Sequence, residues 1–175
     1  MYADEASFKV SGSTSRTWQL KGKGNGLEVK YKVGRESIKA FGAVSIEEIP
    51  HFHFRFAEVF NACTFLDFLK QLVRQYDRKI FLVVDNVRYH FALLIQDWLK
   101  ENTKKIELIF LPPYSPELNA QEYVWRATRR KSTHNHHFSG KEELKQTLFR
   151  RFNRFQGNPK SLSTTIAPFW GDEEE

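Results

Sequence analysis

The sequence has little cysteine, no long apolar run and no segment typical of a secretory signal. Its single thiol, Cys63, cannot form an internal disulfide, which fits a reducing cytoplasm. We expect Cys63 to be a small buried hydrophobe. No apolar run approaches the length of about 20 residues that spans a bilayer, and the first twenty residues mix charge with Ser and Thr. These absences exclude a membrane-spanning or disulfide-stabilised protein and predict a cytoplasmic one.

Acidic residues are also scarce, with 21 Asp and Glu against 27 Lys and Arg. Four of the acids lie in the short tail 171–175, so the rest of the chain carries 27 basic against 17 acidic residues, a surplus of +10. Such a surplus favours a polyanionic partner, most commonly nucleic acid, although an ordinary basic surface gives the same count. The hydrophobic content of 41% over 175 residues predicts one folded domain, 1–170, followed by a disordered acidic tail.

Hydrophobic periodicity predicts an α/β fold with a mixed sheet flanked by helices. We expect strands at 2–10, 17–20, 38–45, 51–56, 79–84 and 106–111, a basic Gly-rich loop at 21–35, and helices at 63–76, 88–100, 117–131 and 141–156. The apolar run 79–84 fits a strand buried on both faces. Alternation in 51–56 places three Phe on one face, as core. In the helix 88–100 the inward-facing residues are expected to be Phe91, Leu94, Ile95, Trp98 and Leu99. In the helix 141–156, spacings of three and four place Leu144, Leu148, Phe152 and Phe155 on one side.

Three acids stand out by their positions in this arrangement. Asp4 lies in the first strand, Asp85 ends the most hydrophobic strand, and Glu122 lies in the first turns of a helix after a proline-rich loop. Ligands of α/β sheets gather at the carboxyl ends of strands. An isolated buried carboxylate is costly, and a hard divalent cation with oxygen ligands removes that cost. The residues alone therefore predict a candidate carboxylate site without specifying a reaction.

Each acid also has a structural alternative. Asp85 could cap the following helix, and Glu122 could be an acid in the first turn that the helix dipole favours. Glu5 competes with Asp4 for the first position, and because successive strand residues point to opposite faces, only one of the two can face the site. Glu117 competes with Glu122, although its place at the helix start suits capping better.

Two passages resemble the signature of the mariner-type insertion-sequence transposases of the DDE superfamily. They are 83–90, VVDNVRYH, and 111–125, LPPYSPELNAQEYVW. The family pattern is a strand ending in Asp-Asn, a His a few residues later, a Pro-Pro-Tyr-Ser-Pro-x-Leu-Asn-Pro-x-Glu loop and a Trp. The 36 residues between Asp85 and Glu122 agree with the family spacing. The start of the chain, 2–8, resembles the first catalytic strand and 16–18 the element after it, so the resemblance spans 2 to about 126. Ala120 and Gln121 depart from the usual Pro and aliphatic residue.

The resemblance implies a ribonuclease H-like fold in which Asp4, Asp85 and Glu122 are the catalytic residues and hold two Mg²⁺ or Mn²⁺ ions. It implies hydrolysis of double-stranded DNA at transposon ends, then transfer of the freed ends into target DNA, typically at TA, by a homodimer in a prokaryotic cytoplasm. Asn86 and His90 would position Asp85 or the DNA backbone. Four basic residues after the third acid are candidates for holding phosphates: Arg126, Arg129, Arg130 and Lys131. Solvated helix charges are the alternative for these four.

Family members carry helix-turn-helix domains ahead of the catalytic domain, whereas this sequence begins three residues before Asp4. We therefore expect a fragment or the second reading frame of a frameshifted element. An inactive or regulatory DNA-binding remnant is the main alternative function. A Holliday-junction or ribonuclease H enzyme is a further alternative that the proline loop disfavours. The cluster 134–137, HNHH, is expected to be a solvated loop, and Trp125 to be a packing residue.

Overall fold

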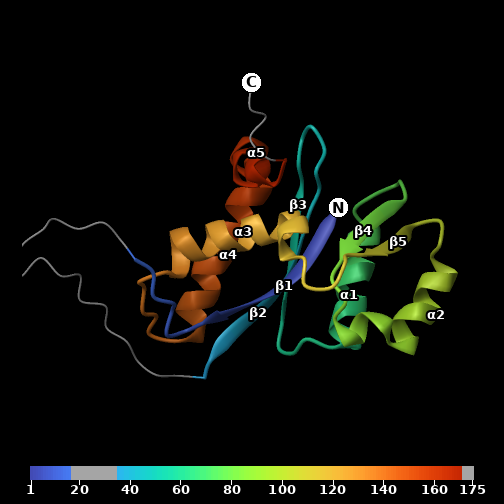
Figure 1. Cartoon of the computed structure of the whole chain (residues 1–175). Helices are drawn as coiled ribbons and strands as arrows, with labels where there is room; N and C mark the ends of the chain where they lie inside the picture. Colours follow the sequence, from blue (N-terminus) through green and yellow to red (C-terminus); the bar gives the residue numbers. More distant parts are fainter. Residues whose placement is uncertain (17–34, 171–175) are drawn as a thin grey trace, which may run out of the picture.

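The computed structural model describes residues 1–16 and 35–170, and within them a mixed five-stranded sheet forms the centre of the fold (Figure 1). The strand order is β3-β2-β1-β4-β5. β1 pairs antiparallel with β2 and parallel with β4, while β2–β3 is antiparallel and β4–β5 parallel. The strands are β1 Tyr2–Lys9, β2 Ser37–Val44, β3 Phe52–Ala57, β4 Ile80–Val84 and β5 Ile106–Phe110. Each lies within one residue of its predicted bounds, which confirms the mixed sheet. The expected strand 17–20, almost all of the expected loop 21–35 and the acidic tail lie outside the described residues.

Helices cover the two faces of the sheet unequally. α3, α4 and α5 pack on one face over β1, β2 and β3, whereas α1 and α2 lie on the other face (Figure 1). The helices are α1 Ala62–Val73, α2 Leu93–Glu101, α3 Ala120–Thr128, α4 Lys141–Gly157 and α5 Pro159–Ile166. Short 3-10 turns span Arg88–Phe91, Pro116–Leu118 and Ala167–Trp170, and a π turn spans Arg129–Thr133. None of the described helices is both long and apolar enough to cross a bilayer.

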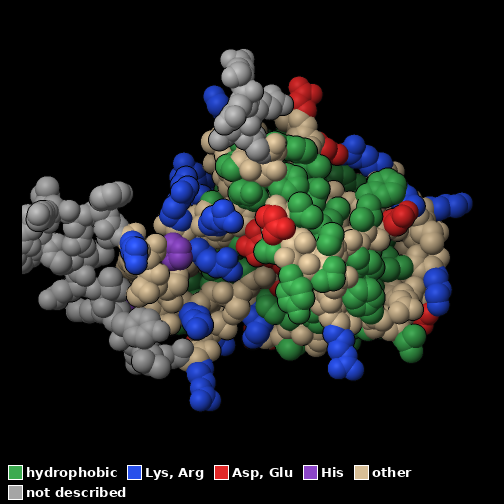
Figure 2. All heavy atoms as spheres, viewed as in Figure 1, with side chains coloured by type: hydrophobic (Ala, Val, Ile, Leu, Met, Phe, Trp, Pro, Cys, Tyr) green, Lys and Arg blue, Asp and Glu red, His purple; other side chains and the backbone are tan. Residues whose placement is uncertain are grey.

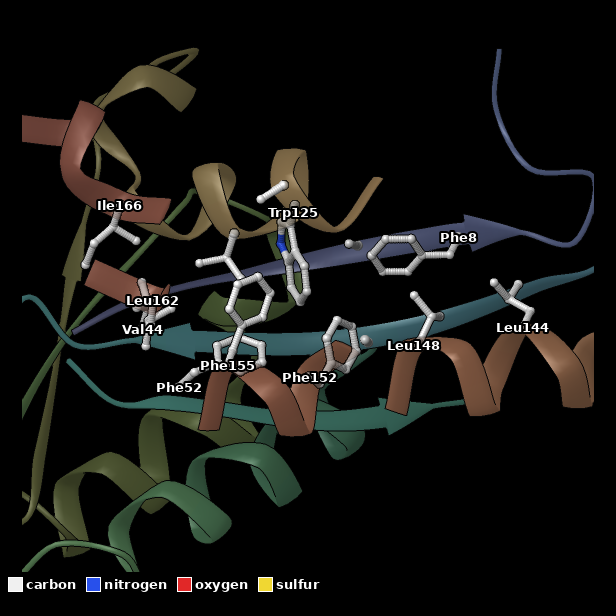
Figure 3. Packing of buried hydrophobic residues seen from close by; sticks show 14 of the residues in the cluster. Phe8, Val44, Phe52, Trp125, Leu144, Leu148, Phe152, Phe155, Leu162 and Ile166 are labelled. Atoms are coloured by element: carbon white, nitrogen blue, oxygen red, sulfur yellow. The ribbon is translucent and has the colours of Figure 1, made fainter. Parts of the chain in front are cut away.

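The larger core lies between the sheet and α3–α5 and is rich in aromatic rings (Figure 3). Trp125 of α3 is completely buried and meets Phe8 of β1 and Phe52 of β3 edge-on, with ring centroids 5.8 and 6.3 Å apart. Edge-to-face contacts of this kind add to the free energy gained from burial alone. The predicted inward face of α4 is confirmed: Leu144, Leu148, Phe152 and Phe155. Trp125 and the Phe-rich strand are therefore core, as the pattern predicted.

The second core lies between the sheet and α1. α1 starts with a capping box in which the Asn61 side chain accepts from the Thr64 N–H and the Thr64 hydroxyl returns the bond to the Asn61 N–H. Its buried residues are Phe65, Leu66, Phe68, Leu69 and Leu72. α1 ends at Val73, three residues earlier than predicted.

The prediction that the strand 79–84 is buried on both faces is wrong. Ile80, Leu82 and Val84 are buried against α1 and α2, but Phe81 is 51% exposed. α3, α4 and α5 pack on β1–β3, and the same face of β4 and β5 carries exposed apolar side chains, including Ile109. A local apolar run cannot indicate which part of a sheet distant helices will cover.

Two further predictions on the α1 and α2 side are also wrong. The helix expected at 88–100 is split, because Ala92 is extended (φ −62°, ψ 144°) between the 3-10 turn and α2. Phe91 and Leu94 are consequently exposed, while Ile95 is fully buried. Cys63 lies in the first turn of α1 and is exposed rather than buried.

Candidate active site

The three predicted acids lie together in one cleft, which has a volume of about 430 Å³. Asp4, Asp85 and Glu122 all line it, together with Asn86 and the proline loop 111–116. β1 and β4 are parallel and pair at Tyr2 and Val83. Because neighbouring strands run about 4.8 Å apart, the same register two residues further on sets Asp4 beside Asp85. The cleft therefore opens where two parallel strands hold carboxylates at the same level.

Asp4 and Glu5 point to opposite faces of β1, as the period of a strand requires. Asp4 lies on the side of Ala6, which packs in the α3 core, and Glu5 lies on the side of Ala3, which packs in the α1 core. Only Asp4 reaches the cleft that Glu122 lines. The register of β1 therefore decides that Asp4, and not Glu5, faces the cleft.

Asn119, which was not among the predicted site residues, fixes the start of the helix that carries Glu122. Its side-chain oxygen accepts from the Gln121 N–H at 3.0 Å, and its amide donates to the Ala3 carbonyl at 3.1 Å. The side chain thus caps α3 and ties the helix start to β1 one residue before Asp4. A continuous helix from 117 was predicted, and this is wrong: Pro116–Leu118 is a 3-10 turn, and α3 begins after Asn119. An Asn immediately before a helix was the signal available in the sequence.

Asp85 does not cap a helix. Its carboxylate accepts from the Val87 N–H at 3.2 Å, and the 3-10 turn that follows has no side-chain cap. Asn86 donates its amide to the Leu111 carbonyl, and the Leu111 N–H donates to the Val84 carbonyl at 2.9 Å. The end of β4 and the proline loop are therefore held together beside Asp85.

The acids of the cleft repel one another. Burial raises the pKa of Asp4 from 3.8 to about 8, and the charges of Glu5, Glu122 and Asp85 add to this rise. Burial also raises the pKa of Asp85, again with a contribution from Glu5. Negative charge gathered in a low-dielectric place favours either a proton or a bound cation.

A second group of side chains contacts Asp85 from behind. The side chain of His90 is buried, with Nδ1 3.0 Å from the Asp85 carbonyl oxygen and Nε2 3.1 Å from Glu5 Oε1. The Tyr89 hydroxyl donates to the same Glu5 oxygen. Within the described part of the chain, Glu5, Asp85 and His90 form a group whose ligand-type atoms all lie within 4.8 Å of one another. Of these residues, His90 was predicted from the sequence to position Asp85, and Glu5 was considered only as an alternative to Asp4. Tyr89 was not predicted to belong to the site.

Basic side chains gather beside the acids (Figure 2). A groove of about 520 Å³ is lined by Lys9, Arg129 and His134 together with Ser13 and Thr14. Arg129 Nη1 lies 4.0 Å from Glu122 Oε2, and the guanidinium stacks over Phe8 at 5.6 Å. Arg129 therefore links this groove to the acidic cleft.

The other predicted basic residues lie farther from the groove. Arg126 stacks on Tyr123 at 5.0 Å, and Arg130 and Lys131 are exposed in the π turn. The solvated loop expected at 134–137 is exposed only at His136, whereas His134 Nδ1 lies 2.7 Å from Ser13 Oγ. This histidine loop is thereby fastened beside β1.

The strand order, the two helix layers and the acids at the ends of parallel strands define a ribonuclease H-like α/β domain. Residues 1–145 match the model of the DDE superfamily endonucleases, and the chain belongs to that superfamily. It is 31% identical over 177 residues to the uncharacterized 39 kDa protein of insertion element IS630 from Shigella sonnei, covering 97% of this chain and 46% of that protein.

Solved structures of the Mos1 transposase share the fold. The mariner Mos1 paired-end complex with Mg superposes with a TM-score of 0.66 at 17% identity, covering 96% of this chain and 51% of that one. The Mos1 strand transfer complex gives 0.62 at 21% identity, covering 99% and 55%. The Mos1 catalytic domain with raltegravir and Mn gives 0.54 at 18% identity, covering 99% and 84%. The chain spans about half the length of the IS630 protein and of the Mos1 chains in the two DNA-end complexes.

Proposed function

We propose that the chain is the catalytic part of a transposase, which cleaves DNA at transposon ends and joins the freed ends to target DNA. The observation that carries the proposal is the cleft in which Asp4, Asp85 and Glu122 meet on elements far apart in the sequence. Membership of the DDE superfamily endonucleases supports it. The Mos1 structures with the same fold include a strand transfer complex and a paired-end complex, which supports the two reaction stages.

The cleft suits divalent metal ions. Its acids offer oxygen donors, the ligands that Mg²⁺ prefers. Burial, with a further contribution from the neighbouring acids, raises the pKa of Asp4 to about 8, and a bound cation would offset both effects. We assign Asp4, Asp85 and Glu122 as ligands of two Mg²⁺ or Mn²⁺ ions. When bound, the ions would activate the attacking oxygen and stabilise the leaving one at the phosphate. Mos1 complexes with Mn and with Mg support the metal type.

The chain itself supplies positioning. Asn119 sets the distance between Glu122 and β1, and Asn86 holds the proline loop against the end of β4. We assign to His90 the role of holding Asp85. Small errors in the geometry of catalytic groups cost a large share of the rate, so fixing the elements that carry Asp85 and Glu122 serves the reaction. No Ser or Tyr nucleophile is needed, because water or a DNA 3′-hydroxyl attacks phosphorus directly.

We propose that the DNA backbone runs from the acidic cleft into the groove of Lys9, Arg129 and His134. Arg129 lies between the two, and cations beside a site of cleavage neutralise flanking phosphates. Arg126, Arg130 and Lys131, exposed on the same segment, would contact phosphates farther along. Tyr114 of the proline loop also lines the cleft, and it is fully exposed with φ 57°. A strained, exposed aromatic at a cleft suits a contact with a base or sugar.

By resemblance, the partner is double-stranded DNA, with transposon ends and a TA target, bound by a homodimer. The paired-end and strand transfer complexes of Mos1 support this choice of partner.

Metal-dependent nicking of supercoiled plasmid DNA tests the assignment. Asp4→Asn, Asp85→Asn and Glu122→Gln should each lower the nicking rate by at least about 100-fold in Mg²⁺ or Mn²⁺, because direct ligands matter more than the groups that orient them. Glu117→Gln is the matched control, since Glu117 is an exposed acid on the 3-10 turn before α3 and does not line the cleft. Its rate should equal that of the wild type.

Undiminished nicking by Asp85→Asn would remove Asp85 from the active site. DNA binding by the wild type with no metal-dependent nicking at all would instead favour the regulatory remnant.

A further inference from the structure

His90 is held in a single orientation behind Asp85. A carbonyl oxygen can only accept a hydrogen bond, so Nδ1 carries a proton and donates to the Asp85 carbonyl at 3.0 Å. The same nitrogen lies 3.5 Å from the Asp85 carboxylate. The other ring nitrogen faces Glu5 Oε1 at 3.1 Å, which places one proton in that hydrogen bond. The ring therefore connects two acids that lie on different strands.

The surroundings of His90 leave it no freedom to turn. Phe65 of α1 lies against its ring with centroids 4.1 Å apart, and Tyr89 packs edge-on at 4.8 Å. The Tyr89 hydroxyl donates to Glu5, and burial, followed by the Glu5 charge, raises the pKa of that hydroxyl, so it remains a donor. The side chain of His90 is 2% exposed and that of Glu5 10% exposed. His90 and Glu5 thus form the buried part of a hydrogen-bonded network that Tyr89 and Asp85 complete.

Glu5 is poorly placed to be a ligand of the cleft itself. It points to the α1 face of β1, away from Asp4, and neither Glu5 nor His90 lines the cleft. Its Oε1 already accepts a hydrogen bond from Tyr89 and lies 3.1 Å from His90 Nε2. The arrangement matches the one found around metal sites, where a carboxylate orients a histidine and outer groups orient the ligands.

We propose that Glu5 and His90 are a positioning pair that fixes the Asp85 carboxylate for divalent-metal binding, a role that rests on the proposed function of Asp85 as a metal ligand. Two adjacent acids of β1 then serve one site from opposite faces of the sheet. Asp4 would bind the metal ions from within the cleft, and Glu5 orients Asp85 through His90 from the α1 face of the sheet.

Calorimetric titration of the chain with Mn²⁺ alone, without DNA, tests this pair. Glu5→Ala and His90→Ala should each weaken Mn²⁺ binding by about 10- to 100-fold, the usual effect of losing a group that orients a ligand. Glu5→Gln keeps an oxygen that accepts from Tyr89 and adds an amide that can hydrogen-bond to His90, but it removes the negative charge, and it should bind Mn²⁺ within about threefold of the wild type. Because the pair acts as a unit, Glu5→Ala combined with His90→Ala should be no weaker than the worse single variant.

Glu143→Gln is the matched control, since Glu143 is an exposed acid that also faces a histidine, His136, at 3.8 Å. It should bind Mn²⁺ like the wild type. Glu5→Gln binding as weakly as Glu5→Ala would overturn the proposal, because charge rather than orientation would then explain the loss. Additive losses in the double variant would overturn it as well. Thermal unfolding of each variant identifies any that fails to fold, and Glu5→Gln, the closest in shape, then decides the matter.

Asp85→Asn, titrated alongside, separates the two proposals. Lost Mn²⁺ binding in Asp85→Asn with unchanged binding in Glu5→Ala would refute the positioning pair and leave the metal site standing. Unchanged binding in Asp85→Asn would instead refute the metal site itself.

Discussion

Asp4→Asn should stabilise the metal-free protein, by an amount that grows with pH. Burial and the neighbouring acids raise the pKa of Asp4 from 3.8 to about 8, so the folded protein holds a proton that the unfolded chain releases above pH 3.8. The wild type therefore has its full stability below pH 3.8 and loses stability as the pH rises towards about 8. Asn carries no charge at any pH and avoids this loss.

The size of the effect follows from about 1.4 kcal/mol for each pH unit between those two pKa values. The variant should be more stable than the wild type by up to about 1.5 kcal/mol at pH 5 and about 4 kcal/mol at pH 7. These are upper values, because the charges of Glu122 and Asp85 contribute to the rise and those groups titrate together with Asp4. For a chain of this length, the increase between pH 5 and pH 7 corresponds to roughly 5–10 °C in Tm.

Thermal unfolding in EDTA at pH 5, 6, 7 and 8 measures this difference. A second series with Mg²⁺ adds a sharper check, since an ion that binds only the folded state with Asp4 ionised stabilises the wild type and not Asp4→Asn. A difference between the two proteins that stays the same from pH 5 to pH 8 would refute the reasoning. It would mean that Asp4 is ionised in the folded state throughout and does not lie among buried acids.

Three further substitutions test the frame of the site. Asn119→Ala removes the cap of α3 and its bond to the Ala3 carbonyl; we expect a loss of about 1–2 kcal/mol in unfolding experiments and a lower nicking rate, and an unchanged rate would mean that α3 is placed by packing alone. Gly12→Ala should cost more than about 1 kcal/mol, because Gly12 has φ +67° and a Cβ would lie 2.0 Å from the His136 carbonyl; a Tm equal to that of the wild type would contradict the fastening of the histidine loop to β1. Trp125→Ala should cost about 3–5 kcal/mol in denaturant unfolding, and a cost below 1 kcal/mol would show that the ring is not the centre of its core.

The sequence predicted well what depends on local periodicity. Alternation placed Phe52, Phe54 and Phe56 on one face, and spacings of three and four gave the buried side of α4. The positions of Asp85 at a strand end and of Glu122 early in a helix were also readable locally. Both lie at the cleft, together with Asp4.

Features set by distant partners could not be predicted in this way. The bond from Asn119 to the Ala3 carbonyl joins residues 116 apart, and the bond from His90 to Glu5 joins residues 85 apart. No local pattern reports such contacts. The exposure of Phe81 has the same origin, since it depends on where α3–α5 pack rather than on the hydrophobicity of the strand itself.

The pairing of β1 with β2 has a consequence for how this site can be lost. All eight residues of β1 pair with β2, and this ladder holds the register in which Asp4 turns to the cleft and Glu5 away from it. A slip or a one-residue deletion between Glu5 and Lys9 would keep both carboxyl groups and most of the fold, yet send each to the wrong side. Such a change would inactivate the proposed site while leaving both acids of β1 and the passages 83–90 and 111–125 unaltered.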